Sequence, residues 1–357
     1  MAFSKDGSSR EAIQAIQFEL WPDCKTGCPF CYLNGTRRVT TLQEKINNVK
    51  DALKTLKNTE LMQAYNAVGL IGGEFFQGQI TGLEAHWNEL ITYLSILLKE
   101  NQIKEVWIAS SLINIIQGDL IGVLYILSQA ELLEDQRITL CTSFDTIGRF
   151  NYNFDGVTPE EIEELAKEGI VPGMLDPDKL NDWLAQIDFV RENYTSVAIH
   201  VQVILTQDVI DKLIEDPNYF DFITDRGCII DFRYPSITRA DCPTATVIED
   251  YRSLLLARYQ DFPPKFFIEN RASFLRFLSI YMEKYGIEKV RNLLHQPEMR
   301  SRRLKIYVDN AELEDRWNDE RDRYLECGHL IDGLCYIDSD KCIYCDIEKF
   351  LETQENA

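Results

Sequence analysis

The sequence has 357 residues, 45% of them hydrophobic, which is enough to bury the large core of a globular protein. Its 37 basic and 58 acidic residues give a formal net charge of −21, and such a field repels nucleic acid unless a local basic patch offsets it. No apolar run approaches the ~20 residues of a membrane-spanning helix, and the first residues lack the apolar stretch of a secretory signal, so a cytoplasmic protein is expected.

Six short apolar runs alternate with longer amphipathic segments over the first two thirds of the chain. Most of the short runs are nearly continuous in apolar residues, which is typical of parallel strands buried on both faces. The longer segments repeat apolar positions at helical spacing. This alternation predicts an α/β fold with a parallel sheet or barrel. The predicted strands are Ala12–Leu20, Ala67–Ile71, Val106–Ala109, Ile138–Thr142, Val197–Leu205 and Cys228–Tyr234, and the predicted helices among them are Thr41–Leu56, Leu83–Lys99 and Ile113–Leu133.

Three cysteines follow the first predicted strand directly. Cys24, Cys28 and Cys31 have the spacing C-x3-C-x2-C, and Phe30 stands before the last of them. A structural zinc or an ordinary cubane cluster takes four protein ligands, so three thiolates leave one metal position open. Soft thiolates on one loop favour an iron–sulfur cluster over a site for a hard cation.

This motif resembles the signature of the radical S-adenosylmethionine (radical SAM) superfamily. The resemblance implies that Cys24, Cys28 and Cys31 hold a [4Fe–4S] cluster and that SAM chelates its fourth iron. It implies reductive cleavage of SAM to a 5′-deoxyadenosyl radical that abstracts a substrate hydrogen. It also implies a partial (βα)6 TIM-like barrel over roughly residues 10–240, with the cluster loop after the first strand.

The glycines of Gly72-Gly73-Glu74 follow the second predicted strand. Glycines let backbone approach a ligand closely, and a carboxylate can accept hydrogen bonds from an ammonium group. Glycines at a strand end often serve only to turn the chain. The resemblance favours the first interpretation, because radical SAM proteins commonly carry a similar motif that contacts the amino group of SAM.

Polar residues also follow the fourth predicted strand. Ser143 and Asp145 carry short side chains that could hydrogen-bond a ribose, although a capping turn is the alternative. Arg149 could bind a carboxylate of SAM or of the substrate, or pair with a nearby acid. In many members of the resembled family, a Ser-x-Asp at this strand end lies against SAM or substrate.

Farther along, Thr158-Pro159-Glu160-Glu161 predicts a helix start inside an insertion after the fourth strand. Two more helices are predicted at Ala245–Tyr259 and Ala272–Leu294. The composition then shifts toward charge and cysteine. These observations predict a barrel over residues 1–241, a helical extension over 242–297 and a small Cys-rich C-terminal domain over 298–357.

The C-terminal domain carries a second group of metal-binding residue types. Cys327, His329, Cys342 and Cys345 form a complete set of zinc ligands, which leaves Cys335 over. Alternatively Cys327, Cys335, Cys342 and Cys345 supply four thiolates to a second iron–sulfur cluster. Free buried thiols are the third alternative. The single residues Cys141, Cys228 and Cys242 are interpreted as core thiols, and His86, His200 and His295 as isolated.

Two basic runs stand out against the acidic background. Lys25, Arg37 and Arg38 flank the cysteine loop, and they form either a solvated face or a docking surface for a reducing protein such as flavodoxin or ferredoxin. The second run, Arg300, Arg302, Arg303 and Lys305, is the only local support for nucleic acid as a substrate.

The sequence therefore favours a radical SAM enzyme that acts on a peptide or a small molecule. One alternative is radical SAM modification of a nucleic-acid base, against which the net charge weighs. The other is a non-enzymatic, metal-stabilised binding protein, which would not need the glycine-glycine-glutamate segment. Nothing in the sequence selects the substrate or the reaction.

Overall fold

The computed structural model describes residues 14–26, 40–113, 115–128, 137–146, 148–152, 157–171, 174–233, 265, 268, 270–294, 300–307, 310–315, 330–331, 334–335 and 343–355. Of the residues described between 300 and 335, it describes the backbone alone.

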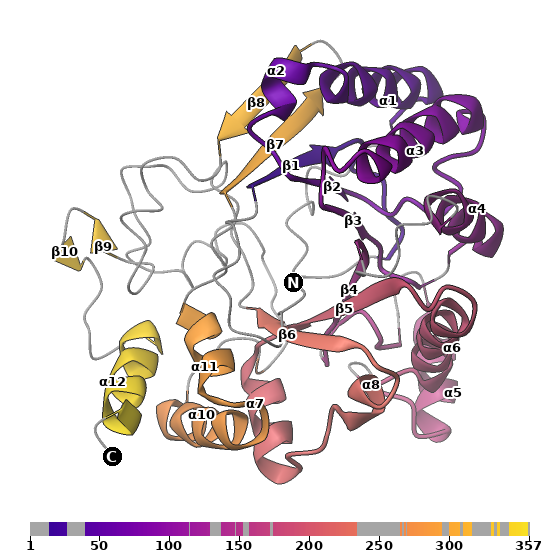
Figure 1. Cartoon of the computed structure of the whole chain (residues 1–357). Coiled ribbons are helices and arrows are strands. Elements are labelled where there is room, and N and C mark those ends of the chain that lie inside the picture. The colour runs from indigo at the N-terminus through magenta and orange to yellow at the C-terminus, as the bar shows by residue number, and fades with distance from the viewer. Residues whose placement is uncertain are drawn as a thin grey trace.

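A single large sheet organises these residues (Figure 1). Its strand order is β6-β5-β4-β3-β2-β1-β7-β8. Every pair from β1 to β6 is parallel, β7 is parallel to β1, and β8 is antiparallel to β7. The strands are β1 (Gln14–Glu19), β2 (Ala67–Ile71), β3 (Glu105–Ala109), β4 (Ile138–Phe144), β5 (Val197–Ile204), β6 (Ile229–Arg233), β7 (Arg300–Tyr307) and β8 (Asn310–Asp315), and a separate pair joins β9 (Leu330–Ile331) to β10 (Leu334–Cys335).

The order of β1 to β6 confirms the predicted parallel α/β sheet. Each of these strands pairs with the next one in the chain, so every crossover steps in the same direction. Right-handed crossovers of this kind place their helices on one face of the sheet, as they do in a (βα) barrel. Figure 1 shows α1, α3, α4 and α6 along one side of the strands. Within the described sheet, β6 and β8 are the edges, and closure into a barrel stays a prediction.

The helices begin and end where local chemistry directs them. Thr41 and Glu44 form a capping box at the start of the first long helix, and Thr158 and Glu161 form another, with proline at the first turn. The second box confirms the predicted helix start. The helices are α1 (Leu42–Leu56), α2 (Thr59–Met62), α3 (Glu84–Lys99), α4 (Gln117–Ser128), α5 (Pro159–Lys167), α6 (Pro177–Asn193), α7 (Gln207–Glu215), α8 (Asp221–Thr224), α10 (Arg271–Tyr285), α11 (Ile287–Leu294) and α12 (Ile343–Glu355).

Two predicted helices need correction. The helix predicted from Ile113 begins only at Gln117, after the loop that follows β3. The predicted helix Ala272–Leu294 is two helices, α10 and α11, because Gly286 between them has a φ of 87°. A residue in this conformation cannot continue an α-helix, and glycine adopts it without steric cost. The predicted helix Ala245–Tyr259 lies outside the described residues.

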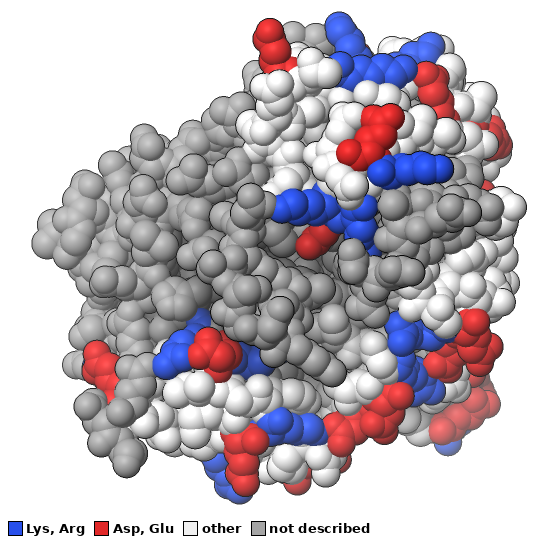
Figure 2. All heavy atoms as spheres, in the orientation of Figure 1, with Lys and Arg blue, Asp and Glu red and all other residues white. Residues whose placement is uncertain are grey.

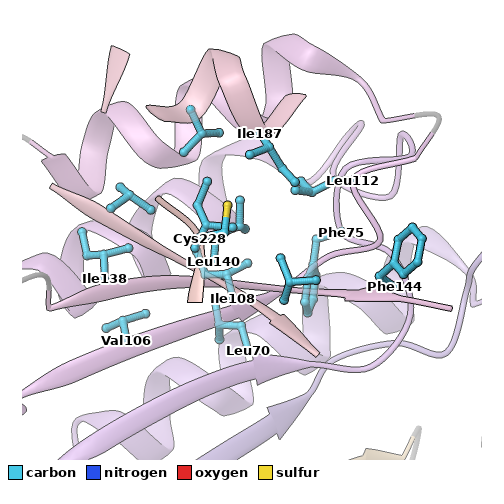
Figure 3. Packing of buried hydrophobic residues seen from close by; sticks show 14 of the residues in the cluster. Leu70, Phe75, Val106, Ile108, Leu112, Ile138, Leu140, Phe144, Ile187 and Cys228 are labelled. Atoms are coloured by element: carbon cyan, nitrogen blue, oxygen red, sulfur yellow. The ribbon is translucent and has the colours of Figure 1, made fainter. Parts of the chain in front are cut away.

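The two faces of the sheet differ in chemistry. Side chains such as Leu70, Val106, Ile108 and Leu140 point to one face, where they join a large cluster with apolar residues of the helices (Figure 3). The opposite face, called here the polar face, carries the alternate residues of each strand. A small apolar group of Ala15, Ala67 and Trp107, with Cys141 packed against it, lies there. The rest of the described polar face is largely polar, and includes Gln17, Glu19, Glu105, Thr139, Ser143, His200, Gln202 and Asp231.

Past residue 298, strands β7 and β8 continue the main sheet beyond β1. The division of the chain at 241/242 and at 297/298 stays a prediction. None of the helices in the described part of the chain has the length and apolar character required to cross a membrane.

Candidate functional site

The candidate site lies at the edge of the sheet where β1 to β4 end. Carboxyl ends of parallel strands meet at one edge, and ligands in parallel α/β folds gather there. Four described segments lie at this edge: residues 21–26 after β1, 72–77 after β2, 110–113 after β3, and 145–146 with 148–149 after β4.

The segment that leads into the cysteine loop runs beside the glycine-glycine-glutamate segment. The backbone N–H of Gly73 donates to the carbonyl of Trp21 at 2.7 Å, and that of Glu74 donates to the carbonyl of Asp23 at 2.9 Å. These bonds extend the parallel pairing of β1 with β2 past the ends of both strands. Cys24, which is half-buried, therefore begins its loop one residue after a backbone position fixed against Glu74.

Close approach of these two segments explains the two glycines. A Cβ atom on Gly73 would lie 1.9 Å from the carbonyl oxygen of Asp23, and one on Gly72 would lie 2.7 Å from that of Trp21. Gly72 also has a φ of 126°, where a side chain is strained. The structure thus places the predicted residues Gly72 and Gly73 beside Trp21 and Asp23, directly before Cys24 in the chain. Their contact with SAM stays a prediction.

Glu74 is held in place by three protein donors. Its side chain is buried, with the residue 1% exposed. One carboxylate oxygen accepts from the hydroxyl of Ser110 at 2.8 Å and from the N–H of Phe76 at 3.1 Å, and the other accepts from the N–H of Ser111. A carboxylate offers about four acceptor positions, so the described donors leave roughly one of them unused. Sequence reasoning missed both serines, although they directly follow the third predicted strand.

Further hydrogen bonds fix the same arm of the loop to the neighbouring strand ends. The N–H of Lys25 donates to the side-chain oxygen of Gln77 at 2.9 Å, and the hydroxyl of Thr26 donates to that of Ser111 at 3.3 Å. Leu112, next along the loop after β3, is fully buried and has a φ of 55°. A bulky side chain at positive φ is strained, and such strain is kept only where packing over-determines it.

Aromatic packing holds the segments after β1 and β2 against helix α3. Trp21 contacts Phe75 edge-to-face at 5.0 Å between ring centroids, and both rings lie 5.6 Å from Trp87 of α3. The three residues are almost fully buried. Because such rings bury a large area with few rotatable bonds, they fix the ends of β1 and β2 relative to the helix layer.

The predicted residues at the end of β4 and directly after it form a cluster with one another. One terminal nitrogen of Arg149 donates to the carbonyl of Ser143 at 2.7 Å and to its hydroxyl at 2.6 Å. The Arg149 backbone N–H donates to Asp145 at 3.0 Å, and its side-chain Nε lies 4.0 Å from the second oxygen of that carboxylate. Asp145 is 1% exposed, so the acid beside Arg149 is a buried one rather than a surface one.

A second polar cluster lies on the polar face at β5 and β6. Nδ1 of His200 is 3.6 Å from the Asp231 carboxylate, whose other oxygen is 3.1 Å from the Lys289 ammonium on α11. Burial lowers the pKa of His200 below its ordinary value, and the Asp231 carboxylate opposes this shift. The sequence indicated an isolated His200, and this interpretation is wrong. In the structure His200 belongs to a group with Asp231 and Lys289.

Most of the predicted metal ligands lie outside the described residues. This holds for Cys28, Cys31, Cys327, His329 and Cys342, and also for Arg37 and Arg38. Cys335 lies in β10 and Cys345 in α12, each with its backbone alone described. Among the residues that are described, no group of three or more His, Cys, Asp or Glu could hold a metal ion.

Two of the single cysteines have a defined place. Cys228 is buried against the helix-covered side of the sheet (Figure 3), and burial raises the pKa of its thiol to about 11. It is a core thiol, as expected. Cys141 is half-buried on the polar face, opposite His200 in the pairing of β4 with β5.

Comparison with known proteins adds little to these observations. No protein-family model matches the chain, and no curated protein matches it. Nine chains of solved structures match. One of them is methylornithine synthase (PylB), which is 14% identical over 74% of this chain and 86% of its own, with a TM-score of 0.22. A score this low does not establish a common fold, so the choice of family depends on the motif residues.

Proposed function

We propose that this chain is a radical SAM enzyme. The observation that carries the proposal is the position of Cys24. The cysteine loop leaves the C-terminal end of β1, and its first arm is hydrogen-bonded to Gly73 and Glu74 at the end of β2. The described arm of the cysteine loop, which carries Cys24, and the buried carboxylate of Glu74 thereby lie at the edge where parallel α/β sheets bind ligands.

The roles of the residues follow from their chemistry. Cys24, Cys28 and Cys31 would hold a [4Fe–4S] cluster, and with SAM bound this cofactor pair would supply a 5′-deoxyadenosyl radical. Glu74 has about one acceptor position left for an ammonium donor such as the amino group of SAM. Gly72 and Gly73 keep that carboxylate close to the cysteine loop, since any side chain there would push the two segments apart.

The cluster of Ser143, Asp145 and Arg149 would form a wall of the same site. Its guanidinium is already oriented by Ser143 and Asp145, so it would meet a ligand carboxylate without first losing side-chain freedom. The substrate would be a peptide or a small molecule bound over the polar face, and the electron would come from a reducing protein such as flavodoxin or ferredoxin. The C-terminal cysteines would bind zinc or a second cluster.

Nucleic acid is a weaker substrate hypothesis. On the face in Figure 2, acidic and basic side chains of the described residues lie beside one another rather than in one basic tract. The basic run of β7 is described in its backbone only. Co-purified nucleic acid, seen as excess absorbance at 260 nm and removed by nuclease, would revive this hypothesis.

The test is an electron paramagnetic resonance spectrum of anaerobically reconstituted, reduced protein, recorded with and without SAM. We expect a cubane signal that shifts when SAM is added, because SAM would occupy the open iron. Cys28→Ala should abolish the signal. The matched control, Cys228→Ala, removes a buried thiol remote from the loop and should keep it.

A second signal that does not respond to SAM would assign the C-terminal cysteines to iron. If the wild-type chain assembles no cluster while a control enzyme does so in parallel, the enzyme proposal is wrong. A metal-stabilised binding protein would then be the remaining interpretation.

A further inference from the structure

The cysteine loop is closed at its base by a buried acid that no motif includes. Asp23 precedes Cys24 directly, and its Oδ1 accepts a hydrogen bond from the backbone N–H of Thr40 at 2.9 Å. All three cysteines lie between these two residues in the chain. The hydrogen bond thus joins the residue before the loop to the residue where the chain returns from it.

A lysine from the helix after the loop reinforces this closure. Nζ of Lys45, on the first turns of α1, is 3.7 Å from Oδ1 of Asp23, and it donates a hydrogen bond to the side chain of Gln79. The side chains of Lys45 and Asp23 are only 11% and 8% exposed. The same nitrogen lies 6.0 Å from the centroid of the Trp21 ring. Asp23, Thr40 and Lys45 are called here the loop latch.

Stability alone does not account for an ion pair at this place. Burying two charges costs desolvation free energy that the pairing only roughly offsets, and apolar residues often serve a core as well. In addition, Oδ2 of Asp23 and the hydroxyl of Thr40 are buried without a hydrogen-bond partner among the described residues. The latch therefore contains two buried polar atoms that make no hydrogen bond with the described residues. One of them belongs to the residue directly before Cys24.

We propose that Asp23 is a positioning residue of the cluster site. Together with Thr40 and Lys45 it fixes the distance that the loop must span, and so pre-organises the three thiolates for one metal centre. This inference rests on the proposed function and adds to it a second role: the latch sets the charge beside the cluster. Lys45 neutralises the Asp23 carboxylate, so the latch adds no net charge at the cluster in the intact protein.

The charge role gives the latch a signature that a purely structural residue would lack. Asp23→Asn leaves the Lys45 ammonium unpaired beside the cluster, which favours the reduced cluster and raises its midpoint potential. Lys45→Met leaves the Asp23 carboxylate unpaired and lowers that potential. Net charge near a cluster is one of the factors that set its potential. The double variant removes both charges, and its potential should return toward that of the wild type.

The experiment compares wild type, Asp23→Asn, Lys45→Met and the double variant, each reconstituted with iron and sulfide. The control is Lys57→Met, which breaks an exposed ion pair between Lys57, at the C-cap of α1, and Glu89 on α3. Circular dichroism checks the fold of each variant. The measurements are the rate of iron loss to a chelator and the cluster midpoint potential.

We expect iron loss to be several-fold faster in every latch variant than in wild type and Lys57→Met, with potential shifts of opposite sign in the two single variants. Should one single variant not fold, the other and the double variant still give both measurements. If folded latch variants keep iron as wild type does, or if both single variants shift the potential in one direction, the inference is wrong. A wild-type chain that binds no cluster would instead refute the proposed function, and the cluster-positioning role with it.

Discussion

Gly73→Ala is the substitution whose effect the geometry defines best. The new methyl group would lie 1.9 Å from the carbonyl oxygen of Asp23 and less than 3 Å from two more backbone atoms of that residue. Backbone cannot rotate away as a side-chain tip can, so the segment before Cys24 and the segment after β2 must separate. The φ of Gly73 itself is not in the left-handed region, and the effect therefore measures the close contact rather than backbone strain.

The expected cost can be estimated from the contacts that separation disturbs. Overpacking a well-packed interior typically costs about 1–3 kcal/mol. Stretching the two inter-segment hydrogen bonds, from Gly73 to Trp21 and from Glu74 to Asp23, adds about 0.5–1.5 kcal/mol each. We expect a loss of about 2–6 kcal/mol in the free energy of unfolding, and a lower iron content after reconstitution because Cys24 moves with Asp23.

The assay is urea unfolding followed by circular dichroism, together with iron analysis. Gly122→Ala is the matched control, because Gly122 lies on the exposed side of α4 with no atom within 4 Å of its Cβ position. That change should stabilise the protein by about 1 kcal/mol, as expected for glycine replaced by alanine inside a helix. A Gly73→Ala protein with wild-type stability and iron content would show that the two segments are not packed as described.

Three further outcomes are expected. Glu74→Gln should lower the free energy of unfolding by about 1–3 kcal/mol. Both carboxylate oxygens of Glu74 accept hydrogen bonds, and the amide replaces one of these acceptors by an NH₂ donor, so at least one of the bonds is lost. Unchanged urea unfolding would contradict this. Burial holds the pKa of His200 in the folded protein below its value in the unfolded chain. The unfolded chain therefore binds more protons than the folded protein as the pH falls below about 6.5. Stability from this group should thus be complete above that pH and decline below it, and His200→Gln should flatten the slope in unfolding measured from pH 7 to pH 5. Cys228, with a thiol pKa of about 11, should resist iodoacetamide at pH 8 until the protein is unfolded, and rapid native labelling there would show that the residue is accessible.

Local chemistry made a large part of this protein predictable. The six apolar runs correspond to β1–β6, because alternate side chains of each strand are buried in the core between the sheet and the helices. The capping residues Thr158 and Glu161 act within one helical turn, so the start of α5 is visible in four letters of sequence. The cysteine spacing is likewise local, because it keeps three thiols close together in the chain whatever the remaining sequence is.

Only the tertiary structure decided which residues share the candidate site. Thr40 reaches Asp23 across 17 positions, and Ser111 reaches Glu74 across 37. Parallel strands are joined by crossovers of a dozen or more residues, so neighbouring strand ends are always distant in the chain. Which donors reach Glu74, and whether His200 is isolated or faces Asp231, depends on strand register and on the pleat. Periodicity in one strand does not specify its partner's side chains, because those are set by packing across the whole sheet.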